Sequence, residues 1–331
     1  GLAFLGFGYW SLVIRTLTQN LIRVILLYTL SKFKAKLIYS IDSFKELFGF
    51  GIKLLTAGLI DNVYRNIYQL VIGKYFSPAE LGYYSRAEQF KNLPSQNIDS
   101  TIQRVTYPVL TNIADNDSKL KAVYKHLLKL LIFITSTTMI LMIINAREII
   151  LILLGEKWAP TIPYLKIIGI SGMIFPLHTL NLNLLKTKGR SDLFLKLEII
   201  KKIIVIPVII IGVHYGMIVM LWGMVFNSFF AYLLNSMFSA KLIGYSTWHQ
   251  LLDIIPTFIN TAIMAILAFA VGQIAPSNLF LSLILKTSVA MGYLFAAGYI
   301  FKIPEFIELK ELTKEQIQLH IGFLRRKEVN A

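Results

Sequence analysis

The residues best suited to chemistry are concentrated in one segment, from Arg86 to Arg104, of an otherwise apolar chain. At the centre of a membrane helix each charged side chain costs about 2.5 to 3.5 kcal/mol unless it meets a partner or water. We therefore expect the polar side of this segment to face a bundle interior or an aqueous cavity, as the wall of a substrate path. Its polar residues are Arg86, Glu88, Gln89, Lys91, Asn92, Gln96, Asn97, Asp99, Ser100, Gln103 and Arg104.

The spacing of these residues predicts one polar helix face. Arg86 and Arg104 are 18 positions apart, which is five full helical turns and places both on one face, roughly 27 Å apart. Pro94 lies between them and predicts a kink or hinge. The alternative interpretation is that these side chains only reach towards the membrane surface or pair within the bundle, as Lys91 would with Glu88.

Two neighbouring segments carry the same residue types. In the preceding segment Asp61 and Arg65 are four residues apart and share a helix face. Either the two neutralise each other, or Arg65 binds an anion while Asp61 tunes it or carries a coupling proton. The N-terminal segment adds Arg15 and Arg23. Amides accompany these charges at Gln19, Asn62, Asn66 and Gln69.

The preference for arginine over lysine in these segments predicts an anionic, phosphorylated substrate. A planar guanidinium binds phosphate through two parallel hydrogen bonds and stays charged when partly dehydrated. Amides along the same path can exchange hydrogen bonds with sugar hydroxyls. Lone amides later in the chain are more typical of hydrogen bonds between packed membrane helices. These are Asn181, Asn183, Asn227 and Asn235.

Long apolar helices must position these residues. Hydrophobic residues make up 56% of the chain, the mean hydropathy is +0.63, and charged residues are 15%, against about 25% in soluble domains. Stretches long enough to cross roughly 30 Å of hydrocarbon recur from end to end. The sequence therefore predicts an all-α polytopic membrane protein with about nine transmembrane helices. They are Tyr9 to Leu30, Leu47 to Ile72, Leu81 to Leu110, Tyr124 to Ile144, Ile162 to Leu185, Leu193 to Ile211, Met217 to Phe238, Leu251 to Gln273 and Leu279 to Phe301.

Alternate loops between these spans are rich in Lys and Arg. This bias marks cytoplasmic loops, and it places the loop from Ser31 to Phe44 and the C-terminus inside. It also explains the net charge of +15 by topology and by attraction to anionic membrane lipids, with no nucleic-acid partner. Past Pro304, apolar residues spaced among Glu, Lys and Arg predict an amphipathic tail on the inner leaflet.

The sequence predicts no cofactor and no metal site. The chain has no Cys, and its five His are scattered without metal-site spacing. It also lacks the phosphate-binding loop of an ATPase. Asp115 and Asp117 form an Asp-x-Asp pattern, but the pattern lies in a short turn without a nucleotide-binding domain, which is typical of a solvated loop.

Short strings along the chain resemble a known family. They are Gly8-Tyr9-Trp10-Ser11-Leu12-Val13, Leu81-Gly82-Tyr83-Tyr84-Ser85-Arg86-Ala87, Arg104-Val105-Thr106-Tyr107-Pro108-Val109-Leu110, Leu154-Gly155-Glu156-Lys157-Trp158 and Gly189-Arg190-Ser191-Asp192. In this order and with this span pattern, the chain resembles the polysaccharide-exporting, Wzx-like branch of the multidrug/oligosaccharidyl-lipid/polysaccharide (MOP) flippase superfamily. The resemblance covers Gly1 to about Phe301.

The resemblance implies two six-helix lobes around a central cavity, followed by a final helix pair. On that template the chain, which opens at Gly1 inside an apolar stretch, is expected to be an N-terminally truncated fragment. Residues 1–30 resemble the last span of the N-terminal lobe, and residues 31–44 the basic cytoplasmic loop between the lobes. Residues 45–240 resemble the C-terminal lobe, 251–301 the final pair, and 302–331 a cytoplasmic tail.

The resemblance also implies a function. It is the flipping of undecaprenyl-diphosphate-linked oligosaccharide units of O-antigen, capsule or exopolysaccharide across the bacterial cytoplasmic membrane by alternating access. We expect Arg65, Arg86 and Arg104 to contact the diphosphate, with support from Arg15 and Arg23. Asp61 or Asp99 is the hypothetical site of coupling to H⁺ or Na⁺. A polysaccharide polymerase and a chain-length regulator are candidate partners. The expected glycan-lining residues are Asn62, Asn66, Gln89, Gln96, Asn97, Ser100 and Gln103.

Two other functions remain open at this stage. A drug exporter of the same superfamily is one, although a cavity for lipophilic cations would favour aromatic and acidic residues over arginine. A membrane-embedded polysaccharide polymerase or glycosyltransferase is the other. It is less favoured because the largest outer loop, Asn145 to Thr161, is modest, so we expect a transporter and not an enzyme.

Overall fold

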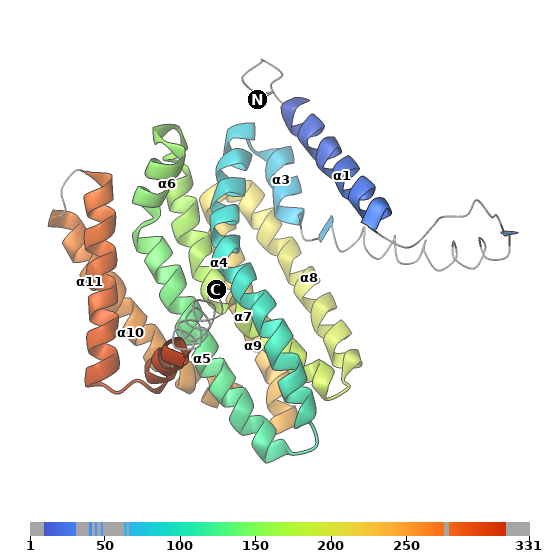
Figure 1. The fold of residues 1–331 in the computed structure, drawn as a ribbon, viewed down its shortest axis with the longest axis vertical. Helices are drawn as coiled ribbons and strands as arrows, with labels where there is room; N and C mark the ends of the chain where they lie inside the picture. The colour runs from blue at the N-terminus through green and yellow to red at the C-terminus, as the bar shows by residue number, and fades with distance from the viewer. Residues whose placement is uncertain are drawn as a thin grey trace, which may run out of the picture. The chain divides into compact units, whose positions relative to one another are not determined.

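The computed structural model of the 331-residue chain describes residues 10–30, 40–41, 44, 48, 63–64, 66–274 and 278–315. Helices account for the regular secondary structure of these residues, and the chain is an all-α polytopic membrane protein (Figure 1). It divides into two units, Gly1–Val63 and Tyr64–Ala331, which are described separately. The first unit contributes one described helix, α1 (Trp10–Leu30).

The second unit is built from helices joined by short turns. Each predicted span other than Leu47 to Ile72 overlaps a described helix whose ends lie within seven residues of the predicted ones. The exception lies mostly outside the described residues. The helices are α3 (Ile67–Tyr75), α4 (Pro78–Asn112), α5 (Asp117–Ile144), α6 (Ala146–Leu154), the short 3₁₀ helix η2 (Glu156–Trp158), α7 (Thr161–Thr187), α8 (Ser191–Tyr215), α9 (Met217–Ile243), α10 (Thr247–Ile274) and α11 (Leu279–Ile300).

The helices differ in how apolar they are. In the described part of the chain, five are long and apolar enough to cross a membrane, namely α5, α7, α9, α10 and α11. Helices α1, α4 and α8 have 21, 35 and 25 residues and are long enough to span, yet they carry more polar or charged side chains. The composition of α4 alone would therefore not identify this long helix as a membrane span.

Capping residues fix where the helices begin and end. Ser77 caps α4, because its Oγ accepts from Glu80 N at 3.2 Å while the Glu80 carboxylate accepts from Ser77 N, and Pro78 occupies the first turn. This capping box starts α4 three residues before the predicted span. At the other end of the bundle, Gly244 stops α9 in the left-handed conformation, with φ of 61°.

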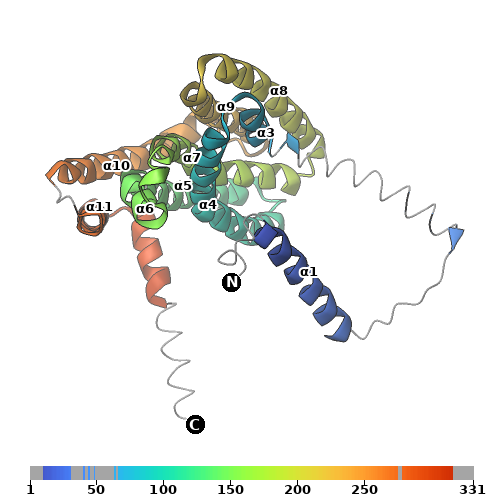
Figure 2. The ribbon, with the colours of Figure 1, turned by 90° about the horizontal axis from the view of Figure 1, so that it is seen from above.

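Helix α7 is the centre of the second unit and packs against α4, α5 and α9 (Figures 1 and 2). Two glycines allow α5 to approach it closely. A Cβ added to Gly169 would lie 2.8 Å from Ile143 Cγ1, and one added to Gly172 would lie 2.8 Å from Met139 Sδ. Small residues of this kind let membrane helices pack backbone against backbone, so α7 holds α4 and α5 in fixed positions.

A second packed cluster joins α10 and α11 to α5 (Figure 2). Residues 304–315 continue beyond α11 as a helix, and the Phe306 ring packs so closely against Gly298 that a Cβ there would clash with it. The predicted tail is thus helical in its first part, docked through the buried Phe306. The rest of the tail lies outside the described residues.

The largest predicted outer loop, Asn145 to Thr161, has helical structure of its own. It contains α6 and η2, which were not predicted. Residues Ala146, Glu148, Ile150 and Leu151 of α6 are buried. Helix α6 has only nine residues and is too short to span a membrane, so it does not appear in the sequence as a long apolar stretch.

Candidate functional site: the polar face of α4

Helix α4 has a buried face and an exposed face. The buried residues recur at helical spacing and pack towards α7. They are Tyr84, Ala87, Ser95, Ile102, Thr106 and Leu110. The predicted polar stripe is on the exposed side. Its exposed members are Arg86, Gln89, Gln96, Asn97, Ser100, Gln103 and Arg104.

Arg86 is held at the N-terminal end of this stripe. Its Nη1 donates to Gln89 Oε1 at 2.8 Å, and its guanidinium lies 5.5 Å from the ring centroid of Trp158. Tyr83 packs edge-on against the same indole, with centroids 5.9 Å apart. Because a guanidinium has five N–H donors and Gln89 is the acceptor that the described residues offer, donors remain for an anionic ligand. The stacking on Trp158 limits the orientations that the guanidinium adopts.

Arg104, at the other end of the stripe, is exposed and makes no ion pair or hydrogen bond with the part of the chain that the structure describes. Asp99 is five residues earlier and is more enclosed. Thr179 Oγ1 of α7 donates to its Oδ1, and Gln103 Nε2 donates to its Oδ2 at 2.9 Å. Asp99 therefore ties α4 to α7, and Gln103 is directed to this carboxylate.

The polar residues around Pro94 hydrogen-bond mainly to their own helix. Asn97 Nδ2 donates to Leu93 O at 2.7 Å, Ser95 Oγ to Lys91 O at 2.9 Å, and Ser100 Oγ to Asn97 O at 3.0 Å. Proline has no N–H to give to the preceding turn, yet α4 runs on through Pro94 as one helix. Whether the residue acts as a hinge stays a prediction.

Glu88 lies on the α3 side of α4. Gln69 Nε2 donates to its Oε2 at 2.7 Å, and Tyr84 Oη donates to its Oε1 at 3.2 Å. The described residues contain no Glu88–Lys91 ion pair within 4.0 Å, and instead the Lys91 stem packs over Gly172. The structure thus brings Gln69 and Glu88 together and does not support simple pairing of Glu88 with Lys91.

Several predicted site residues cannot be joined to this face. Asp61, Asn62 and Arg65 lie outside the described residues. Arg15 and Arg23 are exposed on α1 of the first unit, which is described by itself. Asn66 is half-buried at the start of α3. Their assignment to the site stays a prediction.

Two of the later amides, Asn181 and Asn183, hold helices together, as the sequence predicts for lone amides in apolar spans. Asn181 Oδ1 of α7 accepts from Tyr124 Oη at 2.9 Å and from Ser239 Oγ at 2.5 Å, which links α5, α7 and α9. Asn183 Nδ2 donates to Thr106 Oγ1 of α4 at 3.0 Å. These buried bonds fix the face of α7 on which α4 rests.

Two charged motifs are occupied by partners. Arg190 Nε and Nη2 donate to the two carboxylate oxygens of Asp192 at 2.8 and 2.7 Å, and this bidentate pairing lowers the pKa of Asp192 to about 2. Asp117 of the Asp-x-Asp pattern begins α5 and binds Lys188 Nζ at 2.6 Å. Among the described residues, no group of three or more His, Cys, Asp or Glu is placed to hold a metal ion.

A buried ion pair between α6 and α11 was not predicted from the sequence. Lys286 Nζ lies 2.5 Å from Glu148 Oε1, which also accepts from Ser282 Oγ at 2.8 Å. The side chains are 12% and 1% exposed. The signal in the sequence is Lys286 itself, because a lysine at the eighth position of an apolar helix predicts a carboxylate partner.

The fold and this site define the class of the protein: a multi-pass helical membrane protein with a polar helix face on an apolar bundle. Residues 1–163, about half of the chain, match the family model described as "Polysaccharide biosynthesis protein". The chain is 24% identical to the teichuronic acid biosynthesis protein TuaB of Bacillus subtilis (strain 168) over 73% of this chain and 50% of the relative.

Two further relatives are similar at the same level. The lipopolysaccharide biosynthesis protein WzxC of Escherichia coli (strain K12) is 25% identical over 53% of this chain and 35% of its own length. The succinoglycan biosynthesis transport protein ExoT of Rhizobium meliloti (strain 1021) is 24% identical over 74% of this chain and 48% of its own. The predicted resemblance is confirmed, and the chain is a Wzx-like relative of these polysaccharide biosynthesis proteins.

The chain spans about half the length of the curated relatives TuaB and ExoT. No solved structure matches it.

Proposed function

We propose that this protein exports polysaccharide precursors across the bacterial cytoplasmic membrane, and that it does so by flipping an oligosaccharide carried on a lipid diphosphate. The observation that carries the proposal is the exposed polar face of α4. Arg86 and Arg104 lie at its two ends with donors to spare, and amides lie between them. The names of the relatives support the substrate class, because TuaB, WzxC and ExoT are all named for polysaccharide biosynthesis or transport.

In this proposal the arginines and the amides bind different parts of the substrate. Arg86 and Arg104 hold the diphosphate in turn as it crosses, because arginine binds phosphate through paired hydrogen bonds. Gln96 and the neighbouring amides exchange hydrogen bonds with the glycan, and the lipid chain remains beside the bundle. Arg65, Arg15 and Arg23 are further candidates for contact with the diphosphate.

The remaining parts of the proposal concern the whole transporter. Residues 45–240 form one lobe of a two-lobe protein that alternates access, residues 251–301 are its final helix pair, and the C-terminus lies in the cytoplasm. Asp99 accepts hydrogen bonds from Thr179 and Gln103, which suits a residue that fastens α4 to α7. Asp61 is therefore the better candidate for coupling to H⁺ or Na⁺. A polymerase and a chain-length regulator act on the exported units.

The direct test uses a strain that lacks the full-length protein. We expect lipid-linked oligosaccharide to accumulate on the cytoplasmic face, to return to normal on complementation, and drug susceptibility to remain unchanged. Normal surface glycan in that strain would contradict the proposal. Altered drug susceptibility with normal glycan would instead indicate a drug exporter.

A further inference from the structure

A cavity of about 610 Å³ lies between the end of α5 and helices α6, α7, α10 and α11, and no residue of α4 lines it. Its polar lining comes from helix ends that meet at one level of the bundle. Arg147 and Glu148 begin α6, Lys166 is in the second turn of α7, Gln273 ends α10 and Ser282 begins α11. The distribution of loop charges predicts that this level is on the outer side of the membrane.

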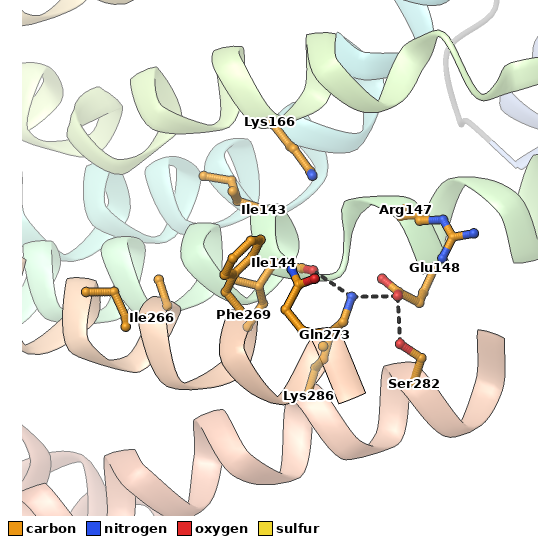
Figure 3. A pocket seen from close by; sticks show the side chains of 12 residues that line it. Ile143, Ile144, Arg147, Glu148, Lys166, Ile266, Phe269, Gln273, Ser282 and Lys286 are labelled. Carbon is orange, nitrogen blue, oxygen red and sulfur yellow. Dashed lines mark hydrogen bonds and ion pairs between the residues drawn. The ribbon is translucent and has the colours of Figure 1, made fainter. Parts of the chain in front are cut away.

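The charges that line the cavity do not balance. Arg147, Lys166 and Lys286 face a single carboxylate, that of Glu148. Lys286 is already satisfied by Glu148, whereas Arg147 and Lys166 are exposed and have no ion pair within the described residues. Figure 3 shows the Lys286–Glu148 pair and Lys166 reaching down from α7. The cavity therefore presents two unsatisfied cations to an anionic group.

The carboxylate of Glu148 adds a second requirement. Its Oε1 accepts from both Lys286 and Ser282, while its Oε2 is buried and receives no hydrogen bond from the described residues. A buried carboxylate oxygen without a donor is unfavourable. A ligand that carries hydroxyl donors beside its negative charge would supply one.

The opposite wall of the cavity is apolar and opens outward. Ile266 and Phe269 of α10 line it and are 64% and 66% exposed, and Ile143, Ile144 and Ala265 continue the surface. In a membrane protein such a wall lies against lipid chains. A soluble anion would make no favourable contact with this apolar wall, whereas a phospholipid places its phosphate at the cations and its acyl chains along the wall.

We propose that this cavity binds the head group of an anionic phospholipid of the phosphatidylglycerol type. The phosphate lies at Arg147 and Lys166, a glycerol hydroxyl donates to Glu148, and an acyl chain follows Ile266 and Phe269. The lipid thereby bridges α6 and α7 to α10 and α11. This site is independent of the proposed export function, because none of its residues belongs to α4.

The test measures the thermal unfolding of the purified chain in a neutral detergent as dioleoylphosphatidylglycerol is added. A ligand that binds the folded state raises the melting temperature with concentration. We expect saturable stabilisation of the unmodified chain, and at least tenfold weaker apparent affinity in Arg147→Gln/Lys166→Gln. Dioleoylphosphatidylcholine and inorganic phosphate serve as the comparison ligands, and both should stabilise far less.

The matched control is Lys74→Gln/Lys157→Gln. It removes the same charge from two exposed lysines on the same predicted side that do not line the cavity, and it should respond as the unmodified chain does. Equal responses of the two double variants would overturn the proposal, as would stabilisation by inorganic phosphate alone. If Arg147→Gln/Lys166→Gln fails to fold, the single variants Arg147→Gln and Lys166→Gln decide the matter, because each removes one of the two cations and should weaken the response, and a full response in both would overturn the proposal.

Discussion

The polar face of α4 and the ion pair between α6 and α11 place charges in the same apolar bundle in opposite ways. Arg86 and Arg104 are exposed, and the described residues offer Arg86 one amide acceptor and Arg104 none. Glu148 and Lys286 are buried, at 1% and 12% exposure, and each neutralises the other. A charge in a membrane helix is tolerated when it meets a partner or water. The comparison teaches that an enclosed, paired charge fastens helices, whereas an open, unpaired one is available to a ligand.

The largest expected effect breaks the enclosed pair. Glu148→Gln leaves the Lys286 ammonium buried without its counter-charge, and we expect a loss of about 3–5 kcal/mol in the free energy of unfolding. Denaturant unfolding in detergent measures it. The double variant Glu148→Gln/Lys286→Met removes both charges and should recover most of the loss. A double variant as unstable as the single one would show that the pair is not what fastens α11 to α6.

A smaller effect is expected where a buried amide joins three helices. Asn181→Ala leaves the hydroxyl of Tyr124 without its acceptor, whereas Ser239 keeps Ser236 O as an acceptor. A buried polar group without a partner costs about 1–3 kcal/mol. Gln96→Ala on the exposed face of α4 is the matched amide control and should leave the melting temperature nearly unchanged. Similar losses of stability in the two variants would mean that the buried Asn181 contributes no more to stability than the exposed Gln96.

The next effect concerns the start of α4. Ser77→Ala removes the capping box with Glu80, and we expect a loss of about 1 kcal/mol in unfolding free energy. Ser77→Gly should lose only a few tenths of that amount, since glycine is tolerated at this position. Thermal unfolding of both variants checks the order. If Ser77→Gly is the less stable of the two, the side-chain cap is not the cause.

The helices themselves could be predicted from the sequence because apolar stretches of membrane length are a local signal. The polar stripe of α4 was also predictable, since Arg86, Asn97 and Arg104 recur at helical spacing. The residues that cover the other face of α4 could not be predicted, because the contacts of Thr179 and Asn183 with α4 join residues about 80 positions apart. Helix α6 was missed because nine residues cannot span a membrane.

The pairing of Lys286 with Glu148 was also missed because it joins distant parts of the chain. The two residues are 138 positions apart, and Glu148 belongs to the segment expected to be a loop. A single lysine in α11 indicates that a partner exists but not which carboxylate it is. Tertiary packing therefore decides which charges are enclosed and which stay open. The sequence shows only that a charge in an apolar helix requires a partner or water.

The measurement that tests the central claim most directly compares stability and export in Arg86→Ala/Arg104→Ala of the full-length protein. Because both side chains are exposed, we expect the unfolding free energy to change by no more than about 0.5 kcal/mol for each substitution, while translocation of lipid-linked glycan is lost. Arg190→Ala, at an arginine already engaged by Asp192, should leave translocation intact. Unchanged translocation in the α4 double variant, at normal protein levels, would contradict the assignment of this face to the substrate.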